Sequence, residues 1–240
     1  MVCNTGVSLT PVVNGEVHHF ESRGLYDGLS VLWDEETETL WNHLTGDAMT
    51  GDLKGQTLGP PHNLWQTTVE AALDAYPDID LALSERPIRR RGRALDPNGR
   101  RRGLSRMFQR TIDREDTRRE TMDIGIGLWA ENNQTAKYYS METLAEADNA
   151  VIDTFDGRRV LVYYAPRVRA LRAIYSPASS VRWEGDDLYL STGHVLRNGV
   201  MYDAAGSAVE IDAPLQVFTR WYGFSLTFPE TEIWELMKDD

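Results

Sequence analysis

The sequence lacks the features that usually indicate secretion or membrane insertion. Among 240 residues Cys3 is the only cysteine, so no disulfide can form within the chain and disulfides say nothing about its compartment. No apolar run approaches the roughly 18 residues of a membrane-spanning helix, so we expect no membrane span. Polar Asn4 and Thr5 follow Met1 almost at once, which is unlike a signal peptide. The chain as given predicts a cytoplasmic location, and export would require a missing upstream segment.

Lysine is scarce, and the basic residues are concentrated in one place. The chain has three lysines, and thirteen of its arginines fall between residues 86 and 119 beside only four acidic residues. The rest of the chain carries 12 basic and 33 acidic residues, a net charge of −21. A surface this anionic repels itself in the folded state, and salt screens the repulsion. We interpret it as adaptation to high salt, with an ordinary acidic cytosolic protein as the alternative.

The common catalytic signatures are missing as well. The sequence has no glycine-rich phosphate loop, no Gly-x-Ser-x-Gly elbow and no His-Glu-x-x-His pair. This absence favours a small-ligand-binding or non-catalytic module, with an enzyme as the alternative.

Short apolar segments separated by turn residues indicate a β-rich fold. Asn14-Gly15 between alternating segments predicts a hairpin joining strands at 7–13 and 17–22, and a further strand is expected at 29–33. A partial apolar stripe that ends at Pro77 predicts a helix over 64–76, with a strand at 79–83 after it. In the second half we expect a helix over 140–147 with Ser140 as its N-cap. The remaining expected strands of the second half are 124–131, 151–155, 159–164 and several short segments from 181 onward, the last of them at 217–228.

The fold class expected from this pattern is α+β and β-rich, with two related antiparallel β halves and few short helices. A weak internal repeat supports two halves, because Trp65 and Trp221 each lead to an aromatic-Pro-acid turn. The predicted units are an N-terminal half at 1–85, an Arg-rich flexible insertion at 86–120 and a C-terminal half at 121–240. One compact domain overall is the alternative.

The clustered arginines of the insertion extend from Arg89, the first residue of an arginine triplet, to Arg119. The insertion has too little apolar material to fold by itself. Clustered arginines suggest binding to nucleic acid or another polyanion, because they neutralise phosphates. The alternative is a solvated linker, or an arm that folds back on the acidic body. Phe108 is the only aromatic residue there, which argues against a base-stacking platform.

Several motifs in a fixed order resemble the family known as domain of unknown function 3179, found in bacteria and archaea. The motifs cover about two thirds of the chain and are Cys3-Asn4-Thr5-Gly6, Val12-Val13-Asn14-Gly15 with Phe20, Gly24-Leu25-Tyr26, Asp34 with Thr37 and Thr39-Leu40-Trp41, Thr45-Gly46-Asp47-Ala48, Gly51-Asp52-Leu53-Lys54-Gly55 with Leu58, and Trp221-Tyr222-Gly223-Phe224 with Phe228-Pro229-Glu230-Thr231-Glu232. The sequence departs from the family in having no stretch before Cys3, no second cysteine at Gly6, and the Arg-rich insertion. The resemblance brings no established activity with it.

Two kinds of chemistry centre on Cys3. As a nucleophile, Cys3 would need a lowered pKa and a base, for which the sequence offers His18, His19 or His43; we take Cys3, His43 and Asp34 as the catalytic candidates. As a metal ligand, it would need one of His18 and His19 together with His43, with or without Asp34, all brought together by the fold; Cys3, His18 and His43 are the metal candidates. Adjacent His18 and His19 point to opposite faces of a strand and cannot both serve one ion. The alternatives are a buried cysteine, a solvent-facing His18 and a turn-capping His43, and the cofactor is a metal ion or, more simply, none.

The remaining site candidates belong to the shared motifs. Asp34, Trp41 and Thr45 are the residues that we expect to contact a small-molecule ligand. The acidic run after Asp34 does not have the spacing of an EF-hand calcium loop, so Glu35, Glu36 and Glu38 are expected to be surface charge.

Overall fold

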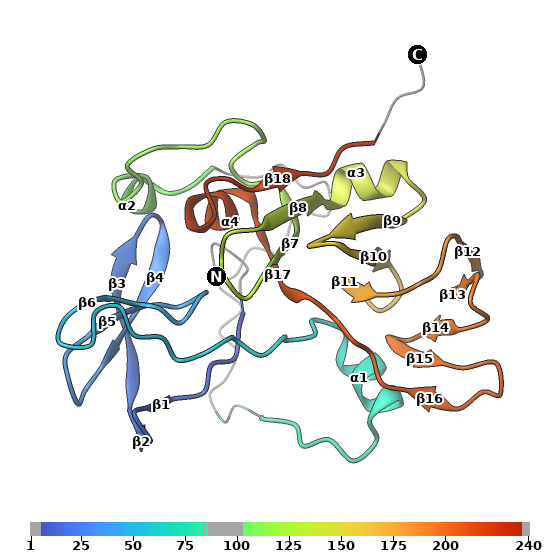
Figure 1. Cartoon of the computed structure of the whole chain (residues 1–240), viewed down its shortest axis with the longest axis horizontal. Helices are drawn as coiled ribbons and strands as arrows, with labels where there is room; N and C mark the ends of the chain where they lie inside the picture. The colour runs from blue at the N-terminus through green and yellow to red at the C-terminus, as the bar shows by residue number, and fades with distance from the viewer. Residues whose placement is uncertain (1–5, 84, 86–102, 237–240) are drawn as a thin grey trace.

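The structure, a computed structural model, describes residues 6–83, 85 and 103–236. Strands account for 38% of the described residues and helices for 11%, which confirms the β-rich α+β class. The described residues form five sheets, which Figure 1 shows arranged from the blue N-terminal sheet to the orange C-terminal one. None of the described helices is long and apolar enough to cross a bilayer.

The N-terminal part of the chain is a small hairpin followed by a four-stranded antiparallel sheet. The hairpin consists of β1 (Val12–Val13) and β2 (Glu16–Val17). The sheet consists of β3 (Phe20–Tyr26), β4 (Leu29–Asp34), β5 (Leu40–Asn42) and β6 (Ala48–Thr50). Asn14 and Gly15 join the hairpin with φ angles of 52° and 87°, the left-handed conformations that its tight turn needs. The Asn-Gly turn is thus confirmed, whereas residues 7–11 form only an isolated bridge at Ser8.

The central sheet joins strands from distant parts of the second half. In spatial order it consists of β17 (Leu215–Arg220), β7 (Ile124–Trp129), β8 (Ala136–Ser140) and β18 (Glu232–Ile233). β18 runs parallel to β8, and the other pairs are antiparallel. Helix α3 (Met141–Glu146) follows β8 directly, and the Ser140 hydroxyl accepts a hydrogen bond from the backbone N–H of Glu142, which confirms the predicted cap.

Helix α4 (Trp221–Thr227) replaces the end of the strand that the sequence predicted over 217–228. Trp221, Phe224 and Phe228 recur every three or four residues and pack on one side into a buried aromatic cluster, so tertiary packing overrides their β propensity. A Cβ at Gly127 of β7 would lie 2.1 Å from the Phe224 ring. Glycine at this position therefore lets the helix approach the sheet.

Two further sheets complete the C-terminal part. A three-stranded antiparallel sheet contains β9 (Ala150–Phe155), β10 (Arg158–Ala165) and β11 (Ala170–Tyr175). A five-stranded meander contains β12 (Val181–Glu184), β13 (Asp187–Leu190), β14 (Val195–Arg197), β15 (Val200–Tyr202) and β16 (Ala208–Val209). Strand β11 had no counterpart in the sequence prediction. The Gln216 side chain bonds both backbone groups of Ala173, which ties β11 to the central sheet.

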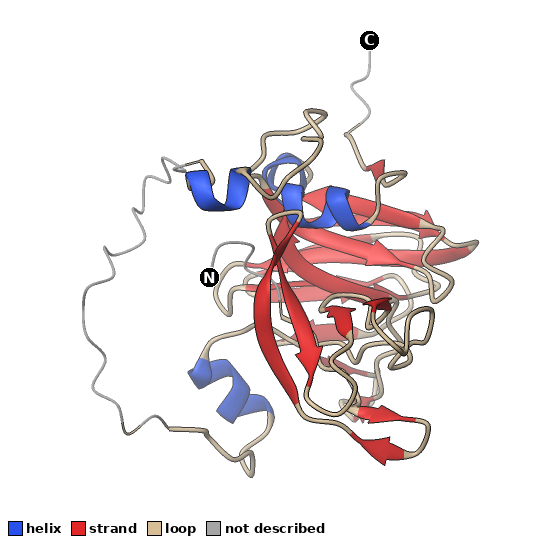
Figure 2. Ribbon diagram, turned by 90° about the vertical axis from the view of Figure 1, so that its left-hand side faces the viewer, coloured by secondary structure: helices blue, strands red, loops and turns tan. Residues whose placement is uncertain are grey.

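The remaining helices are short. They are α1 (Val69–Ala75) and α2 (Arg106–Gln109). Helix α1 begins later than the predicted residue 64 because the segment before it bonds elsewhere: the Thr67 hydroxyl donates to the Val168 carbonyl, and the Thr68 hydroxyl caps the helix. The predicted strand at 79–83 is not formed. Figure 2 shows the helices at the margins of the grouped strands.

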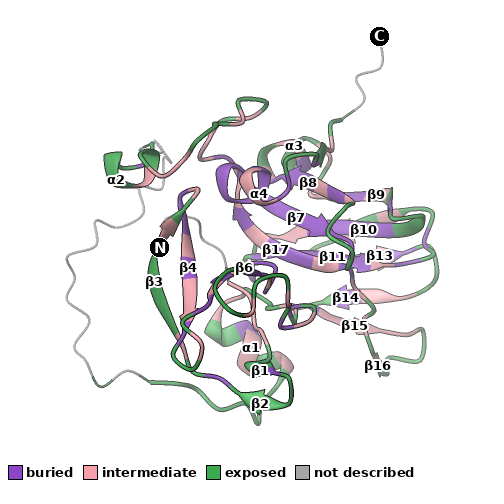
Figure 3. Ribbon diagram, turned by 60° about the vertical axis from the view of Figure 1, so that its left-hand side comes forward, coloured by how far each residue is buried: buried purple, intermediate pink, exposed green. Residues whose placement is uncertain are grey.

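Burial is uneven across the molecule. Figure 3 shows the buried residues gathered on β7, β8, β10, β11 and β17, with β3 largely exposed. The N-terminal sheet meets the rest through Leu29, which packs with Leu104 and Tyr222, and through a hydrogen bond of 3.3 Å from the Tyr222 hydroxyl to the Gly28 carbonyl. The three-unit division of the chain and the relation between its halves stay predictions.

Candidate functional site

Asp34 ends strand β4 and is completely buried at the centre of a polar cluster. The indole N–H of Trp41 donates to it at 2.8 Å, and Thr37 donates from its backbone N–H at 2.7 Å and from its hydroxyl at 2.8 Å. His18 donates from Nδ1 at 3.1 Å, because an ionised carboxylate can only accept. A carboxylate has about four acceptor sites, so these donors fill it.

These contacts hold Asp34 in its charged form. Burial raises its pKa, but the hydrogen bonds from Trp41, Thr37 and His18 outweigh burial and leave the pKa below its ordinary value. The cluster connects β4 to β5 of the N-terminal sheet and to the segment just before β3, where His18 lies. This is the arrangement of a carboxylate that holds a fold together.

The structure brings one of the two histidine candidates to Asp34. His18 is buried beside it, which corrects the alternative of a solvent-facing residue. His18, Asp34 and Glu36 each offer an atom within 4.8 Å of the others, and among the described residues they are the one group close enough to share a metal ion. Glu36 is already bonded to the backbone N–H and ring of exposed His19, at 2.9 and 2.7 Å. A metal here would have to displace donors from a filled carboxylate.

His43 lies apart from that group, on the rim of an apolar hollow. The hollow encloses about 360 Å³, and His43 is the only titratable residue among those that line it; the others include Phe20, Leu32 and Leu58. Trp41 lies beneath, with its ring edge-to-face on Phe20 at 5.9 Å. Trp41 is itself fully buried, so it supports the hollow and is closed to solvent.

Thr45 and the described arginines at the end of the basic stretch bond to residues close to them in the sequence. The Thr45 hydroxyl accepts from the backbone N–H of Asp47 at 3.4 Å inside the turn between β5 and β6. Arg118 pairs with Asp116 at 2.6 Å, and Arg119 with Asp123 at the same distance, so the last arginines of the basic stretch pair with neighbouring acids. Cys3 and residues 86–102, on which the nucleophile and most of the polyanion hypothesis depend, lie outside the described residues.

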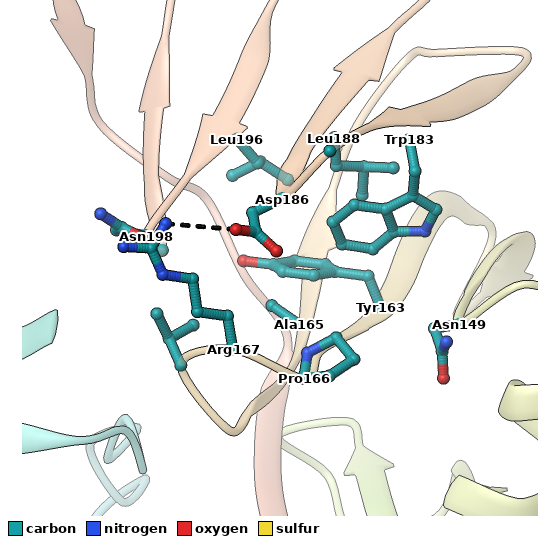
Figure 4. Close-up of a pocket in the computed structure, with 13 residues that line it drawn as sticks. Asn149, Tyr163, Ala165, Pro166, Arg167, Trp183, Asp186, Leu188, Leu196 and Asn198 are labelled. Carbon is teal, nitrogen blue, oxygen red and sulfur yellow. Dashed lines mark hydrogen bonds and ion pairs between the residues drawn. The ribbon is translucent and has the colours of Figure 1, made fainter.

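A second pocket, absent from the sequence hypotheses, lies between the β10–β11 hairpin and the C-terminal meander (Figure 4). It encloses about 210 Å³. Figure 4 shows the Tyr163 ring across the pocket, with Trp183 beyond one end and Arg167, Asp186 and Asn198 near its hydroxyl. Leu188 and Leu196 supply apolar surface. The pocket thus combines an apolar body with one polar end, as small-ligand sites usually do.

The polar groups at this end are unevenly satisfied. Arg167 and Asp186 form an exposed ion pair at 3.1 Å. The Tyr163 hydroxyl is buried and makes no hydrogen bond of ordinary geometry among the described residues, although the Arg172 guanidinium lies close enough to act on it. Burial raises the pKa of Tyr163, and the neighbouring Arg172 guanidinium offsets part of the rise, so the hydroxyl keeps its proton at neutral pH.

Sequence reasoning missed this pocket because its parts are far apart in the chain and individually ordinary. The Asn198-Gly199 turn was readable as a hairpin, with φ angles of 50° and 83°. Its position against Tyr163 depends on how two sheets pack, which no local pattern encodes.

The described residues thus define a β-rich α+β protein with a filled polar cluster in one sheet and a pocket between two others. The chain belongs to the family described as Protein of unknown function (DUF3179), whose model matches residues 1–220. No curated protein and no solved structure matches it.

Proposed function

We propose that the protein is a small-ligand-binding, non-catalytic module whose ligand occupies the pocket at Tyr163. The observation that carries the proposal is the buried Tyr163 hydroxyl without a partner. A buried polar group that makes no hydrogen bond costs roughly 1 to 3 kcal/mol, and a ligand that bonds it recovers that cost. The surrounding Trp183, Leu188 and Leu196 supply the apolar contact surface.

The composition of the pocket supports binding without catalysis. Its lining includes no histidine, cysteine, serine, threonine or lysine, and its one carboxylate, Asp186, is paired with Arg167. A nucleophile and a base within hydrogen-bond reach of each other are therefore lacking among the lining residues. The enzyme or metal alternative built on Cys3 with His43 and His18, and the polyanion alternative, remain predictions.

Binding of small single-ring probes tests the proposal. Benzyl alcohol, benzamide and benzoate are titrated separately while backbone amide resonances are followed by NMR. We expect shifts at Tyr163, Trp183 and Gly199, and their loss in Ala165→Leu, which adds side-chain volume to the lining. Ala204→Leu, at an exposed alanine outside the lining, is the matched control. If none of the three probes moves these amides, the pocket is not a binding site and the proposal fails.

We further propose that the acidic surface adapts this protein to high salt. The motivation is the net charge of −12, which rises to −21 when residues 86–119 are set aside. Salt should screen the repulsion and raise the free energy of unfolding. Urea unfolding at increasing potassium chloride measures this, and a flat or falling stability would contradict it.

A further inference from the structure

We propose that the pocket at Tyr163 selects a small anion, namely a monocarboxylate with an apolar body of about one ring, because the buried guanidinium of Arg172 makes its polar end positive. This inference rests on the proposed function and specifies its ligand. It depends on three observations. Arg172 has no counterion among the described residues, it lies directly behind the pocket wall, and the other two charges at the pocket, Arg167 and Asp186, neutralise each other.

Arg172 is a buried cation without a counterion in the described part of the chain. Its side chain is only 7% exposed, yet no carboxylate pairs with it among the described residues. Its Nη1 donates to the Gly199 carbonyl at 2.8 Å, its guanidinium lies 4.2 Å from the centroid of the Trp65 ring, and its Nε makes no hydrogen bond. Buried charges are normally paired, so an unpaired guanidinium favours the arrival of an anion.

The fold places this cation against the pocket. Tyr163 of β10 and Arg172 of β11 are register partners, so their side chains project from the same face of the sheet. Gly199 lines the pocket, and a Cβ there would lie 2.4 Å from Nη1 of Arg172. The guanidinium therefore sits immediately behind the Asn198-Gly199 turn, beside the Tyr163 hydroxyl.

The other charges at the pocket largely cancel. Arg167 and Asp186 neutralise each other, and their side chains are 62% and 57% exposed, so solvent screens them. Arg172 is buried, where charges are screened far less. The positive electrostatic potential at the Tyr163 hydroxyl therefore comes mainly from the charge of Arg172.

A carboxylate satisfies this polar end. One of its oxygens accepts from the Tyr163 hydroxyl, and its charge is attracted by Arg172. A single ring or branched chain fills the space against Trp183, Leu188 and Leu196, and the volume of about 210 Å³ sets that size. Neutral isosteres make the same apolar contacts without the charge.

Benzoate and benzamide test the inference because they have nearly the same shape and differ in charge. Their dissociation constants are measured by NMR titration on the wild type, Arg172→Met and Tyr163→Phe. We expect benzoate to bind the wild type about tenfold more tightly than benzamide, as a bond to a charged group implies. This preference should disappear in Arg172→Met and weaken in Tyr163→Phe. Arg182→Met is the matched control, because exposed Arg182 also lies over an aromatic ring, that of Tyr189 at 4.9 Å.

The outcomes separate the two proposals. Equal affinity of the wild type for both probes overturns the anion inference and leaves the binding function standing. No binding of either probe, or of benzyl alcohol, overturns both. If Arg172→Met does not fold, the wild-type comparison and Tyr163→Phe still decide, since a wild type without a preference for benzoate contradicts the inference without any variant at Arg172.

Discussion

The N-terminal sheet and the C-terminal pocket each bury a polar centre, but only the first is complete. In the N-terminal sheet, four donors from Trp41, Thr37 and His18 surround the Asp34 carboxylate. In the C-terminal pocket, the Tyr163 hydroxyl and Nε of Arg172 have no hydrogen-bond partner within the described residues. Both centres exclude most solvent, so the difference does not come from burial.

This difference separates structural from functional polar residues. A buried network whose members are all satisfied makes a fold rigid and unique, whereas an incomplete one leaves free energy for a further partner. Asp34, which the sequence motif singles out, therefore has a structural role: it holds the N-terminal sheet together. Tyr163 and Arg172 do not stand out, and yet theirs is the centre with room for a ligand.

The largest expected effect is on the complete centre. Asp34→Ala removes the shared acceptor of the Trp41, Thr37 and His18 donors, and we expect a loss of about 3 kcal/mol or more in the free energy of unfolding. Urea denaturation followed by circular dichroism measures it. Glu35→Gln, at the exposed neighbouring position, should change stability by less than about 0.5 kcal/mol.

Acid provides an independent measurement of the same centre. The pKa of Asp34 in the folded protein lies below its ordinary value, so the carboxylate contributes stability that is present above about pH 4. That contribution is lost as the pH falls through the folded pKa. The stability difference between the wild type and Asp34→Asn should therefore shrink in acid, and a difference that stays constant down to acid unfolding would show that the charge of Asp34 is irrelevant.

A smaller loss in the free energy of unfolding is expected for a substitution in the Asn198-Gly199 turn, which packs against Arg172. Gly199 and Gly206 both have left-handed backbones, with φ of 83° and 82°, but a Cβ at Gly206 meets nothing within 4 Å. Gly206→Ala should cost about 1 kcal/mol for the backbone alone. Gly199→Ala must also push the Arg172 guanidinium, and we expect roughly 2 to 3 kcal/mol. Equal losses in the two variants would mean that Arg172 does not press on the turn.

The sequence predicted elements better than it predicted contacts between them. The Asn14-Gly15 hairpin and the Ser140 cap depend on neighbouring residues, and local turn and cap chemistry specifies them. The aromatic residues from Trp221 to Phe228 favour a strand, and the helical stripe among them spans only two turns, so the local pattern does not predict the helix that forms there. Its helix is decided by packing against Gly127, a residue far away in the chain.

The same limit applies to the sites. Asp34 could be selected from its motif, but the side chains that surround it could be assigned only once β4, β5 and the segment at His18 were aligned. Glu36 was expected to be simple surface charge, and it is exposed but bonded to His19. The Tyr163 pocket depends on a cross-strand register and on the packing of two sheets, neither of which the spacing of residues within one segment determines.

The smallest expected effect distinguishes two buried tyrosines, and it is the sharpest test of the comparison. The Tyr139 hydroxyl donates to Asp153 at 2.9 Å, whereas the Tyr163 hydroxyl donates to nothing in the described chain. Tyr139→Phe should lose about 1 kcal/mol in urea unfolding, because Asp153 loses a hydrogen bond. Tyr163→Phe should stay within about 0.5 kcal/mol of the wild type or gain stability, because it removes a polar group that the fold does not satisfy. If both variants lose the same free energy, the Tyr163 hydroxyl is satisfied in solution and the second centre is as complete as the first.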